Sequence, residues 1–350
     1  MLGVYSFRLC GRSFSLFSVM RPLLDLPSPS NLTFMWNFGS LLFVLMVVQV
    51  FSGLVLSTWY NTYVPFEAVD HLCREVCYGS FLRNLHAVGS SLIFIVLYLH
   101  MGRALLLYSK SALTWLSGVV LFLLLVVISF LGYTLPWGTM SYWAATVILS
   151  LFTVILPVEY LYADYIVSHN TLCRIYTLHF LLPFVLLVMV CVHVVSLHSK
   201  GSSAAFTPVT IVDYTKLHFH PLYTLKDSFI IVCVLLGMCL ITLLYYSYAY
   251  HPDNFSESNP LQTPAHIEPE WYFLWMYAIL RCMPSKLGGI IAVVVILLLL
   301  ALSHQQRLTS PWSVVATFFI LTYVGSCEPS YPYDVVSRVA TVLMALLLSV

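Results

Sequence analysis

Four histidines in two otherwise apolar stretches have a matched spacing. His86 and His100 are 14 residues apart in the first stretch, and His179 and His193 are 14 residues apart in the second. In an α-helix, 14 residues return to within about 40° of the starting face and advance about 21 Å. Each stretch therefore predicts a helix that carries two imidazoles, one above the other, on the same side.

Imidazoles inside long apolar helices suggest axial ligation of haem iron. Polar groups at membrane depth are costly and mark functional sites, and a neutral imidazole is a common haem ligand. The predicted ligand pairs are His86 with His179 and His100 with His193. A single membrane histidine could equally be hydrogen-bonded within a bundle, but the repeated spacing favours two haems. No Cys-x-x-Cys-His sequence occurs, so these haems should be non-covalent b haems.

The composition restricts the fold class. Of the 350 residues, 60% are hydrophobic and 8% are charged, whereas soluble domains carry about 25% charged residues. The apolar stretches are much longer than barrel strands, so we expect an all-α integral membrane protein. The formal net charge of +1 gives no reason to expect nucleic acid as a partner.

Hydropathy and loop composition suggest how the chain is organised. About eight transmembrane helices are expected, at 36–58, 82–108, 114–135, 172–197, 228–249, 287–303, 312–326 and 334–350. The predicted units are an amphipathic surface segment (1–34), a four-helix di-haem bundle (35–200, with an outer-side loop at 138–171), an inner-side loop (201–227) and C-terminal helices (228–350, with a loop at 250–286).

The loop charges orient these helices. If the N-terminus and every second loop share one side, that side holds nine basic and three acidic residues, and the other side holds six basic and eleven acidic residues. The positive-inside rule then places the N-terminus in the cytoplasm-like compartment, called here the inner side. The same parity makes the two histidine helices parallel, with His86 and His179 in the outer half.

Four glycines repeat the spacing of the histidines. Each of two further apolar stretches carries a pair of glycines 14 residues apart, which suggests two more helices that let a flat macrocycle approach the backbone. Glycine is also common in membrane helices for packing reasons alone. The glycines are Gly39 and Gly53 in the first stretch, and Gly118 and Gly132 in the other.

Two arginines flank the first histidine helix. Arg83 and Arg103 stand at its two ends, where haem propionates would emerge and need cations. Simple snorkelling of a long basic side chain to the membrane interface would explain them equally well.

Two loops contain groups that can exchange protons. On the outer side, Glu270 stands between Pro269 and Trp271, where a carboxylate with a tunable pKa could accept protons, although a solvated loop glutamate is the ordinary alternative. The inner side carries several groups that can donate, accept or relay protons, namely His198, Ser202, Lys226 and Asp227.

Together these motifs resemble the cytochrome b family, the haem-bearing core of the respiratory ubiquinol:cytochrome c oxidoreductase (complex III). The resemblance runs from about Leu26 to Tyr333, and one continuous chain is more similar to the mitochondrial form than to the split b6 form. The matching motifs, besides the histidines, are Leu26–Asn31, Trp36–Ser40, Leu135–Gly138, Pro269–Tyr272 and Ala278–Arg281.

The resemblance implies a Q cycle with two quinone sites. It implies quinol oxidation at an outer site around Tyr133, Met140, Trp143, Ala144, Ile148 and Glu270 to Tyr277, including Tyr272. It implies quinone reduction at an inner site near Trp36, Ser40, His198, Ser202, Lys226 and Asp227. Glu270, Tyr272, Tyr133, His198 and Asp227 would then be the catalytic residues.

The resemblance also implies partners and a location. The expected partners are an iron-sulfur protein, cytochrome c1 and membrane lipid, in a homodimer of the complex that uses ubiquinone as substrate. The expected location is the mitochondrial inner membrane, or the cytoplasmic membrane of a bacterium. The sequence departs from the family at Val158-Glu159-Tyr160, where a Tyr-Ile-Gly turn is usual, and at Ala144, where glycine is common.

Two other functions remain open on the sequence alone. A two-haem membrane anchor of a quinone-linked dehydrogenase would also stack histidines on helices, but it has no need of the Pro269–Tyr272 loop. A transporter would leave the histidines unexplained, and the chain shows no repeat of broken helices in matching positions.

Overall fold

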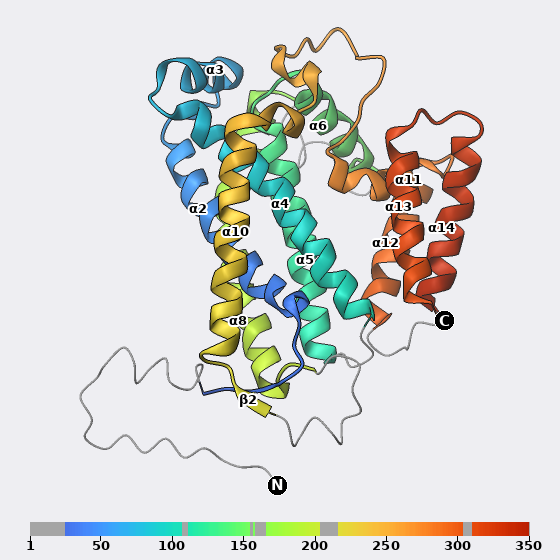
Figure 1. The fold of residues 1–350 in the computed structure, drawn as a ribbon. Coiled ribbons are helices and arrows are strands. Elements are labelled where there is room, and N and C mark those ends of the chain that lie inside the picture. Colours follow the sequence, from blue (N-terminus) through green and yellow to red (C-terminus); the bar gives the residue numbers. More distant parts are fainter. Residues whose placement is uncertain are drawn as a thin grey trace.

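The computed structural model describes residues 25–106, 111–154, 157, 166–203, 216–303 and 310–349, and these residues are mostly helical. Long helices run side by side along the molecule, and the C-terminal helices stand beside them (Figure 1). The long helices are α2 (Phe38–Ser57), α4 (Gly79–Leu106), α5 (Ala112–Thr134), α8 (His169–Lys200) and α10 (Leu222–Leu244).

Shorter elements cap and flank this bundle. The shorter helices are α3 (Pro65–Glu75), α6 (Thr139–Phe152), α11 (Leu274–Arg281), α12 (Lys286–Leu302), α13 (Pro311–Ser326) and α14 (Tyr333–Ser349). Single turns of 3-10 helix are η1 (Phe34–Asn37), η2 (Tyr246–Ala249), η3 (Pro252–Phe255) and η4 (Trp271–Phe273), and two short strands are β1 (Pro27–Pro29) and β2 (Lys216–His218).

The helices have the lengths and compositions of membrane spans. Within the described ranges, the five long helices, the first of them counted together with η1, are long and apolar enough to cross a bilayer. The C-terminal helices α12, α13 and α14 are shorter, at 17, 16 and 17 residues. They lie where the last three spans were expected, and the expected all-α membrane fold is confirmed.

The long helices pack in two pairs. α2 lies against α4 and α5 lies against α8, while α10 covers the outside of α2 and α4. Phe94 and Phe122, from α4 and α5, are fully buried in the shared core. Many apolar side chains of α8 and α10 face outward instead, as expected for helix faces in contact with lipid tails.

Local sequence signals explain where α8 begins and ends. The Ser168 hydroxyl accepts from the Asn170 amide, and the Thr171 side chain accepts from the Ser168 amide, so the first turn has a capping box. Gly201 ends the helix with a φ of 75°, which costs glycine less than any other residue. Because α8 continues as one helix between these signals, with Pro183 inside it, His179 and His193 are carried on the same element.

The two ends of the bundle differ. β1 pairs antiparallel with β2 at the inner end, and Trp36 and Arg103 also lie together at that end. α3 and α6 lie at the opposite, outer end (Figure 1). The structure therefore places Lys216 of β2 and Lys226 in the first turns of α10 on the side of Arg103, as the charge distribution indicated.

Three local features differ from expectation. α10 begins at Leu222, six residues before the expected start at 228, because its first turns carry polar residues that hydropathy does not detect. The segments expected as loops at 138–171 and 250–286 contain the helices α6 and α11, and the expected surface segment at 1–34 contains the strand β1. Residues 1–24 of the expected surface segment, and Val158–Tyr160, lie outside the described residues.

Candidate functional site

The four histidines face each other in two pairs inside the bundle. The ring centroids of His86 and His179 are 6.4 Å apart, and those of His100 and His193 are 6.5 Å apart. A metal ion between two imidazoles, with metal–nitrogen bonds of about 2 Å, places the ring centroids roughly 6 Å apart. Each pair therefore has the spacing that axial ligation of one iron requires.

Hydrogen bonds to Nδ1 orient three of these rings. Ser52 Oγ donates to Val48 O and lies 2.9 Å from His86 Nδ1, and Ser117 Oγ donates to Thr114 O and lies 2.9 Å from His193 Nδ1. With the hydroxyl proton engaged elsewhere, each serine oxygen accepts from Nδ1–H. Nε2 then keeps a free lone pair, which is the form that binds a metal.

The other two rings differ from each other. His179 Nδ1 is 2.9 Å from Ile128 O, and a carbonyl oxygen only accepts, so this ring also presents an unprotonated Nε2. His100 Nδ1 is buried and has no hydrogen-bond partner among the described residues. His100 is thus the ligand candidate whose ring is held by packing alone.

Each of the four glycines lies against one of the four histidines. A Cβ atom added at Gly132 would come within 2.5 Å of His179 Cε1, and one at Gly53 within 3.1 Å of His86 Cε1. The corresponding distances are 3.2 Å from Gly118 to His193 and 3.5 Å from Gly39 to His100. The 14-residue glycine spacing therefore corresponds to close approach of the ligand imidazoles to α2 and α5.

Ser52 and Ser117 were missed by the sequence analysis, although the sequence carries a signal for them. Both precede one of the spaced glycines, so a Ser-Gly dipeptide occurs once in α2 and once in α5. Ser52-Gly53 contacts His86 at the outer level, and Ser117-Gly118 contacts His193 at the inner level.

Removing these hydroxyls should loosen the ligand rings. We expect Ser52→Ala to weaken the outer haem and Ser117→Ala the inner one, each by about 10- to 100-fold in affinity, as for other partners of metal-bound histidine. The measurement is the loss of each b-haem absorbance band during dilution in detergent. Ser150→Ala, at a half-buried serine of α6 whose hydroxyl donates only to Val147 O of its own helix, is the matched control. Equal haem retention in all three variants would refute this role.

The two candidate propionate partners have aromatic neighbours. The Arg83 guanidinium lies 4.1 Å from the ring centroid of Tyr250, and that of Arg103 lies 5.4 Å from the ring of Trp36. Arg103 also donates to Met35 O at 3.4 Å, while its Nε is buried without a partner among the described residues. An unpaired buried donor at the inner end is consistent with an anionic ligand group there.

A cavity of about 260 Å³ joins the outer histidine pair to the outer loop. Its lining includes His86, His179, Arg83, Tyr133, Glu270 and Tyr272. The predicted outer haem ligands and three of the predicted catalytic residues therefore line the same cavity.

Glu270 is the carboxylate in this cavity. Burial raises its pKa to about 7, and the neighbouring Glu268 carboxylate adds to the rise. Near neutral pH the group can therefore both accept and release a proton. Tyr272 is buried, and burial keeps the pKa of its phenol well above the usual range, so it stays a neutral hydrogen-bond donor.

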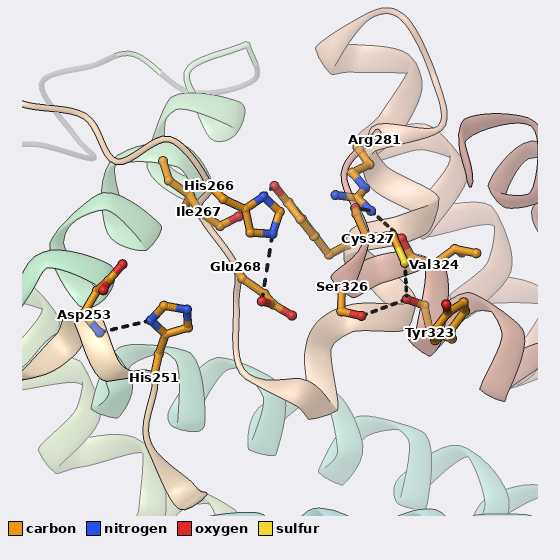
Figure 2. A network of polar contacts seen from close by, with 11 residues as sticks. His251, Asp253, His266, Ile267, Glu268, Arg281, Tyr323, Val324, Ser326 and Cys327 are labelled. Atoms are coloured by element: carbon orange, nitrogen blue, oxygen red, sulfur yellow. Dashed lines mark hydrogen bonds and ion pairs between the residues drawn. The ribbon is translucent and has the colours of Figure 1, made fainter. Parts of the chain in front are cut away.

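The loop before η4 adds a second acidic group. Figure 2 shows His266 facing Glu268, with His266 Nε2 3.9 Å from Glu268 Oε2. The same view shows Arg281 of α11 donating to Val324 O in α13 and to Cys327 O at the C-terminal end of α13. These bonds tie α11, and with it the loop that carries Glu270, to α13.

Tyr98 positions the outer loop and was not identified from the sequence. It lies in α4 between the two ligand histidines, its hydroxyl donates to Tyr272 O at 2.6 Å, and it accepts from Trp275 Nε1 at 3.0 Å. No pattern in the sequence singles it out, because its partners are more than 170 residues away.

Other residues expected at the outer site, Ile148 among them, do not line this cavity. Met140 and Ala144 are buried in α6, and Trp143 packs on Tyr142 with its Nε1 buried and unpartnered among the described residues. The Tyr277 hydroxyl donates to Ile267 O at 3.3 Å. Their role in quinol binding stays a prediction.

The structure assembles part of the expected inner site. Ser40 Oγ donates to Asp227 Oδ1 at 2.8 Å, and Asn37 Nδ2 donates to the same oxygen. Lys226 Nζ donates to Leu32 O at 3.0 Å. Asn37 is an additional residue that the sequence analysis did not select, although it belongs to the Trp36–Ser40 motif.

His198 and Ser202 stand apart from this group. His198 is exposed in the last turn of α8 and forms no hydrogen bond with Asp227 in the described part of the chain. Ser202 lies just beyond the end of α8 and is half-buried. The expected bracket of a quinone between His198 and Asp227 stays a prediction, whereas Ser40 and Asp227 are in contact.

The fold and the facing imidazoles define a helical membrane protein with two candidate haem-binding positions. The cytochrome b/b6/petB family model matches residues 23–201, and the model for the C-terminal part of cytochrome b, shared with b6/petD, matches residues 257–345. The chain therefore belongs to the cytochrome b family. As such it is a multi-pass membrane protein that binds haem b.

A solved structure has the same fold. A chain of "Hyperthermophilic respiratory Complex III" superposes with a TM-score of 0.84 at 27% sequence identity, and the match covers 95% of this chain and 94% of that one. The similarity thus extends over the whole bundle and the C-terminal helices, as the sequence motifs indicated.

Proposed function

We propose that this chain is the quinol-oxidising and quinone-reducing, proton-translocating subunit of a quinol:cytochrome c oxidoreductase. The observation that carries the proposal is the single cavity lined by the outer histidine pair and by Glu270 and Tyr133. A simple two-haem anchor needs the histidines but not a half-buried carboxylate in the same cavity. Membership of the family and the likeness to a respiratory complex III chain support the same function.

Two b haems fit the residues present. His86 and His179 would hold the outer one and His100 and His193 the inner one, with Arg83 and Arg103 near the propionates. The ring separations, the Nδ1 partners and the close glycines all suit bound macrocycles. Each haem, when bound, supplies a carrier for single electrons.

At the outer site, the chain's own task is to take protons from quinol. Oxidation of a quinol to a quinone removes two electrons and two protons. Glu270, with a pKa of about 7, accepts one of these protons at its carboxylate oxygen. Tyr133 and Tyr272 line the same cavity and orient the substrate through their hydroxyls, while the apolar lining excludes water.

At the inner site, the task is reversed, because reduction of a quinone consumes protons. Asp227 accepts hydrogen bonds from Ser40 and Asn37 and is next to Lys226 in the chain. Its carboxyl group can therefore pass a proton to a carbonyl oxygen of the quinone near the inner membrane surface. Trp36 and Arg103 lie together at the same end and offer a flat apolar face and a cation.

The function implies an assembly and a location. We propose that the chain works with an iron-sulfur protein and cytochrome c1 in a homodimeric complex surrounded by lipid, with ubiquinone as substrate at two sites. We place it in the mitochondrial inner membrane, or in the bacterial cytoplasmic membrane if the source is prokaryotic.

The proposal is tested on the purified complex. We expect a pyridine haemochrome spectrum with two b haems per chain, and reduction of cytochrome c by quinol that is blocked independently by ligands of the outer and inner sites. Two b haems without quinol:cytochrome c activity would favour the dehydrogenase anchor, and no b haem would refute both redox functions.

Asp227→Asn should slow the inner reaction. The amide keeps an oxygen for Ser40 and Asn37 but cannot hold a proton to deliver. We expect re-oxidation of the inner haem by quinone to slow by roughly a hundredfold, the lower range of general acid–base contributions. Flash or stopped-flow absorbance of the inner b band measures it. His198→Ala tests the second expected residue in parallel. A parent-like rate in Asp227→Asn would mean that the inner quinone site does not depend on Asp227.

A further inference from the structure

A thiol–imidazole pair lies at the outer start of α8, outside the cavity described above. Cys173 Sγ is 3.3 Å from His169 Nε2, and these two residues are one helical turn apart. The Cys173 thiol also lies 3.5 Å from Thr62 Oγ1, in the turn that follows α2. Three groups that can move a proton therefore meet where two distant segments touch.

The protonation of the imidazole can be assigned. His169 Nδ1 is 2.7 Å from the carbonyl oxygen of Thr62, and a carbonyl only accepts, so Nδ1 carries the proton. In the neutral ring, Nε2 is then a free base, and it is the nitrogen that faces the sulfur. The ring of Tyr63 stacks on this imidazole, with centroids 4.3 Å apart, and holds its plane.

This arrangement has the parts of an activated nucleophile. A thiol beside a base, with the base oriented by a third group, is the pattern that increases sulfur reactivity. After the proton has moved to Nε2, the imidazolium and the Thr62 hydroxyl both face the sulfur and stabilise the thiolate. Cys173 is half-buried rather than enclosed, so a small reagent can reach it.

We propose that Cys173 is a base-activated thiol, a modification site whose co-reactant is a small peroxide such as hydrogen peroxide. The thiol proton moves to His169 Nε2, and the sulfur attacks one peroxide oxygen. The O–O bond breaks, and the leaving hydroxide takes the proton from the imidazolium as water. The sulfur is oxidised to a sulfenic acid and the peroxide is reduced, so one thiol and one peroxide give one sulfenic acid and one water.

The position links this modification to the outer end of the bundle. Tyr176 lies one turn after Cys173, and its ring centroid is 5.1 Å from that of Tyr60. Tyr60 and Tyr176 both line the outer cavity. The added oxygen would stand between α8 and the turn after α2, where Thr62 now accepts from the imidazole.

The test measures sulfenic acid at each cysteine of the intact complex. The complex is treated with hydrogen peroxide at neutral pH in the presence of a 1,3-diketone that traps sulfenic acids, and labelled peptides are quantified by mass spectrometry. Exposed Cys77 serves as the internal reference. We expect Cys173 to be labelled about tenfold faster than Cys77, since His169 Nε2 lies 3.3 Å from the Cys173 sulfur and can take up the thiol proton as the sulfur attacks.

Variants separate activation from mere exposure. His169→Phe keeps a ring to stack on Tyr63 but removes the base, and we expect Cys173 labelling to fall to the Cys77 rate. His169→Asn is a second variant without Nε2, and Cys173→Ser should abolish the labelled peptide. The b-haem spectrum of each variant reports correct folding.

Two results would overturn the proposal. One is parent-like labelling of Cys173 in a correctly folded His169 variant. The other is labelling of Cys173 no faster than that of Cys77 in the parent complex, which needs no variant at all.

Discussion

Leucine at any one of the four ligand histidines should remove one b haem and abolish quinol:cytochrome c activity. We expect His86→Leu and His179→Leu to lose the outer haem, and His100→Leu and His193→Leu to lose the inner one. The ring centroids within each pair are 6.4 and 6.5 Å apart, so the two histidines of a pair would hold one haem between them. Leucine has a similar volume but no lone pair, so that haem would lose one of its two histidine ligands. Low-temperature absorbance spectra, in which the two b bands separate, measure which haem remains.

A histidine on the same helix provides the control. His198 is exposed near the end of α8 and faces neither pair, so His198→Leu should keep both haems. Loss of different haems from the two members of one pair would contradict the parallel arrangement of α4 and α8, because each pair lies at one depth.

The parts of the site that could be predicted depend on periodicity within one helix. At 14 residues apart, two side chains lie on nearly the same helix face, so the stacking of the histidines on one side of each helix, and of the glycines on two others, needed no tertiary information. Loop charges then gave the relative direction of the helices. The Ser52-Gly53 and Ser117-Gly118 dipeptides are also local sequence patterns, so the two serines could have been predicted from the sequence.

The remainder depends on contacts between distant segments. Tyr98 is hydrogen-bonded to Tyr272, and Asn37 to Asp227, at sequence separations of 174 and 190 residues. No local sequence pattern predicts which residues form such long-range contacts. Hydropathy also marks apolar stretches rather than helix starts, so the polar first turns of α10 were not anticipated. The helix α6 is apolar but has only 14 residues, fewer than a membrane span needs, so a search for spans did not find it.

Glu270→Gln should slow quinol oxidation by roughly a hundredfold, because the amide keeps the shape of the side chain and removes the base. The carboxyl lies in the cavity that contains His86 and His179, and burial raises its pKa to about 7. Steady-state reduction of cytochrome c by quinol, with haem content verified by spectrum, measures the effect. A parent-like rate would mean that the proton leaves by another route.

The pH dependence gives a sharper test, with a sign fixed by the pKa. Below about pH 7 the Glu270 carboxyl is protonated and cannot accept a proton, and above it the carboxylate is available. The rate of quinol oxidation in the parent should therefore rise as pH increases through about 7, whereas the Glu270→Gln rate should show no such rise.

Glu268→Gln is the matched control, since it removes a neighbouring negative charge that contributes to the raised pKa of Glu270. In that variant the rise should remain but move to lower pH. A rise that stays at the parent pH in Glu268→Gln, or persists in Glu270→Gln, would assign the titration to a group other than Glu270.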